Sequence, residues 1–116
     1  MAAIARCHAQ RYPLPMNLEQ AIFKLSNLSD RAILFVERIE GQFLPESRSV
    51  ILELSDEELE VPVADIAKLR APGTEYFLEA FIIQDMVQEW EGDPVLDQAS
   101  RTQLIKTIIN YAENDA

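Results

Sequence analysis

Residues 32–36 read AILFV and residues 49–54 read SVILEL, and these two stretches decide the fold class. The first is an uninterrupted apolar run rich in Ile, Phe and Val, so it predicts a buried strand that continues towards Ile39. In the second, apolar side chains recur at every other position, which is the period of a strand. Gly41 and Pro45 indicate a loop between them. The two stretches therefore predict a pair of neighbouring strands.

The segment before the first strand predicts a helix. Asn17 and Gln20 have the spacing of a capping box, in which two side chains bond the free N–H groups of a helix start. Apolar residues then recur at helical intervals and define one face: Leu18, Ala21, Ile22, Leu25 and Leu28. Ser29 and Asp30 predict the end of this helix. We expect the folded domain to start at Met16.

The stretch after the second strand supports two interpretations. Ser55 and Glu58 also match a capping box, which favours a helix start. Pro62 would stop such a helix within two turns, and apolar residues alternate over 59–63 as in a strand. We interpret the stretch as a hairpin, with an acidic turn at 55–58 and a short strand at 59–63. Because proline cannot donate to a ladder, this strand is expected at a sheet edge.

The C-terminal half predicts helices. Residues 64–69 fit a short helical turn, and Thr74 is expected to cap a long helix that runs to Trp90 and is apolar on nearly every side. Gly92 stops it, and Ser100 is expected to cap the last helix. One side of that helix is apolar: Leu104, Ile105, Ile108, Ile109, Tyr111 and Ala112. The predicted fold is α+β, a small antiparallel sheet of two or three strands with one face covered by three or four helices.

The length and the termini predict a single domain. The chain has 116 residues, enough for one domain of ordinary size. Residues 1–15 contain Pro13 and Pro15 and no acidic residue, so we expect a flexible tail followed by one α+β domain at 16–116. No apolar run approaches the ~20 residues of a membrane span, and the N-terminus lacks the apolar stretch of a secretory signal. With a single Cys, these features predict a cytoplasmic protein.

Composition excludes several classes of function. Lys and Arg total 10 against 20 Asp and Glu, a formal net charge of −10, which argues against direct binding of nucleic acid or of anionic membranes. One Cys and one His argue against structural zinc, disulfide scaffolds and most Cys/His catalysis. No Gly-rich phosphate loop is possible with three scattered glycines. We therefore expect a protein without enzymatic activity, cofactor or metal.

The acidic residues are unevenly distributed, and this is the feature furthest from average. Residues 53–65 hold six acidic residues and no basic one, and residues 71–100 hold seven acidic residues and no basic one. Such surfaces promote solubility, and they also steer association with basic clefts. The first choice of partner-binding residues is Glu53, Asp56, Glu57, Glu58, Glu60 and Asp65. The alternative set is Asp85, Glu89, Trp90, Glu91 and Asp93.

The profile predicts a binding protein with a basic protein partner. A small, acidic, motif-poor α+β chain is similar in composition to bacterial immunity proteins and toxin inhibitors, which block a nuclease by covering its basic site. That resemblance implies an immunity protein or inhibitor for a basic toxin such as a nuclease. The alternative is a homodimeric accessory or scaffold protein that associates through the apolar helix predicted at 74–90.

Overall fold

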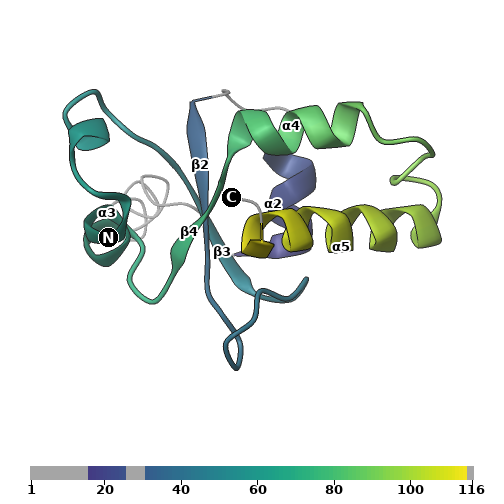
Figure 1. The fold of residues 1–116 in the computed structure, drawn as a ribbon, viewed down its shortest axis with the longest axis horizontal. Coiled ribbons are helices and arrows are strands. Elements are labelled where there is room, and N and C mark those ends of the chain that lie inside the picture. The colour runs from purple at the N-terminus through teal and green to yellow at the C-terminus, as the bar shows by residue number, and fades with distance from the viewer. Residues whose placement is uncertain (1–15, 26–30, 115–116) are drawn as a thin grey trace, which may run out of the picture.

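The computed structural model describes residues 16–25 and 31–114. The predicted N-terminal tail at 1–15 and the predicted helix end around Leu28 to Asp30 lie outside the described residues. The described elements, in chain order, are β1 (Met16–Asn17), α2 (Leu18–Lys24), β2 (Ala32–Val36), β3 (Arg48–Glu53), η2 (Glu58–Glu60), α3 (Val63–Arg70), β4 (Glu75–Glu79), α4 (Ala80–Gln88) and α5 (Gln98–Asn114). Figure 1 shows their arrangement.

The four strands form one antiparallel sheet in the order β1-β3-β2-β4. The predicted α+β class is confirmed, and the sheet has one strand more than the largest number predicted. β2 and β3 lie where the two deciding stretches placed them. The capping box of α2 is also confirmed, because Asn17 Oδ1 accepts from the Gln20 N–H at 2.8 Å and Gln20 Oε1 accepts from the Asn17 N–H at 3.0 Å.

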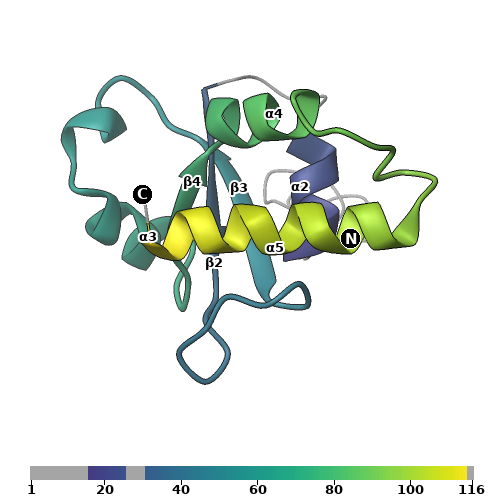
Figure 2. The ribbon, with the colours of Figure 1, turned by 45° about the vertical axis from the view of Figure 1, so that its right-hand side comes forward.

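Helices cover both faces of the sheet, whereas the sequence predicted cover on one face. α2, α4 and α5 pack on one side, and α3 lies on the other (Figures 1 and 2). Every residue of the central strand β2 is therefore buried. Ala32, Leu34 and Val36 point into the core beneath α2, α4 and α5, while Ile33 and Phe35 point into a smaller core under α3. A strand buried on both faces is continuously apolar, which explains the AILFV run.

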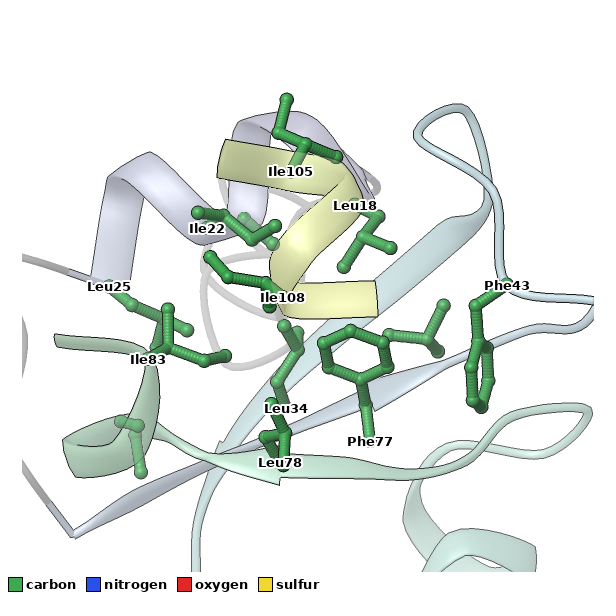
Figure 3. Packing of buried hydrophobic residues seen from close by; sticks show 14 of the residues in the cluster. Leu18, Ile22, Leu25, Leu34, Phe43, Phe77, Leu78, Ile83, Ile105 and Ile108 are labelled. Carbon is green, nitrogen blue, oxygen red and sulfur yellow. The ribbon is translucent and has the colours of Figure 1, made fainter. Parts of the chain in front are cut away.

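The larger core joins the sheet to three helices (Figure 3). Leu104, Ile105 and Ile108 of α5 are buried there, as the sequence predicted. The rings of Phe43 and Phe77 meet edge to face at a centroid distance of 5.0 Å, a favourable geometry for two aromatic rings. This core fixes α4 and α5 on the sheet.

The prediction of one long helix from Thr74 to Trp90 is wrong. Residues 75–79 form the edge strand β4, and only Ala80–Gln88 is helical. Leu34 pairs with Leu78 but Phe35 pairs with Tyr76, so Phe77 is the extra residue of a β-bulge. A bulge turns two successive side chains to one face, and Phe77 and Leu78 indeed both enter the larger core. Because of the bulge, apolar and polar residues do not alternate along 75–79, and this alternation is the signal that predicts a strand.

The prediction of a hairpin at 55–63 is also wrong, and the Ser55–Glu58 capping box that favoured a helix start is present. The Glu58 N–H donates to Ser55 Oγ at 3.2 Å and the Ser55 N–H donates to Glu58 Oε1 at 3.0 Å. This capping box closes the turn at residues 55–58, from which the short 3-10 helix η2 continues. Pro62 then precedes α3, and its carbonyl accepts from the N–H groups of Asp65 and Ile66. A proline suits a helix start because the missing N–H would have no partner there.

The last helix begins three residues earlier than expected. α5 starts at Gln98, and Asp97 Oδ1 accepts from the Ala99 N–H at 3.0 Å. Ser100, the predicted cap, instead accepts a hydrogen bond from Trp90 Nε1 at 2.9 Å. This bond ties the connection between α4 and α5 to the first turn of α5.

Candidate functional site

The acidic segment, residues 53–65, runs from the end of β3 through η2 into the first turn of α3. Glu53, Glu57, Glu60 and Asp65 are exposed, and no ion pair joins any of them to another described residue. Asp56 is exposed and forms an ion pair with Arg31 at 3.1 Å. The structure thus places five of the six predicted carboxylates in solvent.

Glu58 differs from its neighbours because it is half-buried and has several partners. Arg70 Nη1 donates to both oxygens of its carboxylate, at 2.9 and 2.8 Å. The Ser55 backbone N–H and the Arg70 side chain together hold the pKa of Glu58 below its ordinary value. Glu58 therefore holds η2 against α3. Among the six predicted partner-binding residues, Glu58 is thus the one whose carboxylate also links two elements of the fold.

We expect Glu58→Gln to lower the urea midpoint at neutral pH and Glu57→Gln to leave it nearly unchanged. A carboxylate with a lowered folded-state pKa stabilises the fold above its unfolded-state pKa, and that stabilisation is lost as pH falls through the folded-state value. The difference between the wild type and Glu58→Gln should therefore shrink in acid. Urea denaturation of all three proteins from pH 7 to pH 3 measures this, and equal midpoints for both variants at pH 7 would contradict the assignment.

The alternative set of predicted residues lies along α4 and the connection to α5. Asp85, Glu89 and Glu91 are exposed. Asp93 Oδ1 accepts from the N–H groups of Val95 and Leu96, so this carboxylate shapes the loop. Trp90 is half-buried and packs against the larger core. Its role in the described structure is to anchor this loop.

A pocket of about 200 Å³ lies between the acidic segment and the start of α4. It opens at the end of the sheet where β2 begins and where β3 and β4 finish. Its lining residues are Arg31, Ala32, Ile33, Leu54, Leu59, Glu79 and Phe81. Leu59 is 55% exposed and Phe81 is 47% exposed. We call this hollow the η2–α4 pocket.

The sequence did not predict this pocket. Leu59 was assigned to an edge strand, and Phe81 to the middle of a long helix. A usable signal was present, because Leu59 and Val61 are apolar residues within an otherwise acidic stretch. The part of the pocket formed by Phe81 depends on the bulged strand β4, which ends immediately before α4.

A second hollow, of about 340 Å³, separates α3 from β4. Its lining combines small apolar side chains with one cation and one anion: Val63, Ala64, Ala67, Lys68, Thr74, Glu75 and Tyr76. Burial raises the pKa of the Tyr76 hydroxyl. The opposite charges of Lys68 and Glu75 give this groove no dominant sign, unlike the acidic segment.

Within residues 16–25 and 31–114, no group of three or more His, Cys, Asp or Glu side chains is placed to hold a metal ion. None of the helices in the described part of the chain combines the length and the hydropathy that a bilayer span requires.

Comparisons with family models, with curated proteins and with solved structures each give no match for this chain.

Proposed function

We propose that this protein binds a basic protein partner through the acidic segment. The observation that carries the proposal is a short stretch that combines exposed carboxylates with the exposed apolar residues Leu59 and Val61. Four of these carboxylates form no ion pair within the described part of the chain: Glu53, Glu57, Glu60 and Asp65. Interfaces combine a central apolar contact with a polar rim. The acidic segment has both components.

The acidic segment is also held in one conformation, which favours binding. Its turn is closed by the Ser55–Glu58 capping box, and Arg70 ties Glu58 to α3. A surface that is already ordered loses less conformational entropy when a partner docks. Glu57 lies within this turn and Glu60 lies two residues after it, and both are exposed.

The class of partner that we propose is a basic toxin such as a nuclease. Proteins that handle nucleic acid carry basic clefts, because cationic side chains are needed to contact phosphates. A protein with a net charge of −10 is attracted to such a cleft and would neutralise the toxin by covering its active site. This is the action of an immunity protein or inhibitor, and it requires no catalysis.

The double variant Glu57→Lys/Glu60→Lys tests the proposal. Electrostatic steering raises association rates by 10 to 10³, so we expect this variant to associate about tenfold or more slowly at low salt. Its rate should also depend less on salt than that of the wild type. The measurement is surface-immobilised binding kinetics with the partner captured from the native host, followed by an assay of whether the wild type blocks that partner's activity.

Two matched controls separate a local contact from overall charge. Glu40→Lys/Glu46→Lys makes the same charge change at two exposed residues of the β2–β3 connection, at the opposite end of the sheet (Figure 1). It should slow association much less. Asp85→Lys/Glu89→Lys tests the alternative set on α4. If Glu40→Lys/Glu46→Lys slows association as much as the first variant does, overall charge and not the acidic segment controls the rate.

A further inference from the structure

The η2–α4 pocket has the construction of a site for one apolar side chain. Ile33 and Leu54, 6% and 5% exposed, form its floor, and Leu59 and Phe81 form its walls. The volume of about 200 Å³ compares with the ~150 Å³ apolar cavity that accommodates a benzene molecule. A phenylalanine or leucine side chain therefore fits.

Acidic residues accompany the pocket. Glu79 belongs to its lining, and the exposed residues Asp56, Glu57 and Glu60 lie in the same short stretch of chain as Leu59. Asp85 follows Phe81 by four residues on α4, so the two side chains share one face of the helix. The cation of the lining, Arg31, forms an ion pair with Asp56. Because Arg31 is paired with Asp56, the Glu79 carboxylate and the exposed carboxylates of Glu57 and Glu60 near Leu59 leave an excess of negative charge in this region.

We propose that the pocket receives a single large apolar side chain from a basic segment of the partner. This inference rests on the proposed function, because it names the chemistry that the acidic segment recognises. Leu59 and Phe81 are then the residues that determine affinity, while the nearby carboxylates set the rate of association. Anchors in desolvated pockets carry most of the binding energy of an interface, and rim charges mainly guide the encounter.

The test uses two synthetic peptides that differ at one position. Each has a central residue flanked by lysines, and that residue is phenylalanine in one peptide and alanine in the other. Binding to the full chain is followed by ¹H–¹⁵N correlation spectra. We expect the phenylalanine peptide to bind about tenfold or more tightly, as burial of one large apolar side chain implies. The largest shifts should fall on Ile33, Leu54 and Phe81.

Variants of the pocket walls provide the second measurement. Leu59→Ala and Phe81→Ala should each reduce the preference for the phenylalanine peptide to less than about threefold, because each removes part of the apolar wall. Leu69→Ala is the matched control, since Leu69 is 78% exposed on α3 and does not line the pocket. It should keep the full preference. Circular dichroism confirms that each variant is folded.

The remaining outcomes each overturn the inference in a recognisable way. Equal affinity for both peptides, with binding lost in Glu57→Lys/Glu60→Lys, would mean that the charge contact holds and the anchor does not. A preference whose shifts map outside the pocket would place the anchor elsewhere. Self-association that is lost in Phe81→Ala would assign the pocket to a second copy of the chain. Absence of binding by the phenylalanine peptide would reject the anchor, while the basic partner stands or falls with the association kinetics of Glu57→Lys/Glu60→Lys.

Discussion

Replacing Phe35 with alanine is expected to lower the free energy of unfolding by about 3–5 kcal/mol, the range for truncation of a buried phenylalanine. Phe35 is fully buried in the smaller core, against Ile33, Leu52 and Ile66. Its removal leaves a cavity that the sheet and α3 cannot close. Because domains of this size are stabilised by only about 5–15 kcal/mol, a large part of the stability should disappear. Urea denaturation followed by circular dichroism measures the loss.

Phe81→Ala is the matched control for this prediction. It removes the same side chain from a position that is 47% exposed, so the loss should be much smaller. The comparison tests whether α3 covers the second face of the sheet. An equal loss in the two variants would mean that Phe35 is as exposed as Phe81, and that the smaller core does not form.

Ile108→Ala is expected to lower the free energy of unfolding by about 2–5 kcal/mol. Ile108 is fully buried and lies where α5 meets the larger core, as Figure 3 shows. The lost side chain contacts the sheet as well as the neighbouring helices, so no single element can move to fill the space. The measurement is again urea denaturation, with the slope of the transition compared between variants.

Ile109→Ala controls for helix propensity, since it makes the same substitution at the next position of α5. Ile109 is only partly buried at the margin of the larger core, so it should lose clearly less stability. If Ile108→Ala proved as mild as Ile109→Ala, α5 would not be docked on the sheet through this face.

The two stability predictions also define how binding variants can be interpreted. Leu59, Glu57 and Glu60 lie outside both cores and are exposed. Their substitution should change partner binding without a comparable change in stability. Glu58 is different, because its bonds to Arg70 and Ser55 make it part of the fold. A binding defect in a Glu58 variant would therefore not distinguish contact from misfolding.

The predictions that the structure confirms rest on local physical signals. The capping box at Asn17 and Gln20 involves residues three positions apart, so the chain carries all the information that it needs. The strands at 32–36 and 49–54 were predictable because the period of apolar residues reflects burial. The buried face of α5 was predictable for the same reason. These features, together with the charge distribution of the acidic segment, follow from the sequence alone.

Other features depend on contacts between residues that are distant in the chain. Phe77 and Leu78 enter one core only because β4 pairs with β2 through a bulge; without that partner, residues 75–79 cannot be distinguished from helix. The spacing of the Ser55–Glu58 capping box is recognisable in the sequence. The bond from Arg70 to the Glu58 carboxylate, which supports that capping box, joins residues twelve positions apart and is not. Leu59 and Phe81 become neighbours because antiparallel pairing brings the ends of β3 and β4 to the start of β2. The run AILFV carries the two-sided burial of β2, but only tertiary pairing decided which helices cover each face and where the η2–α4 pocket forms.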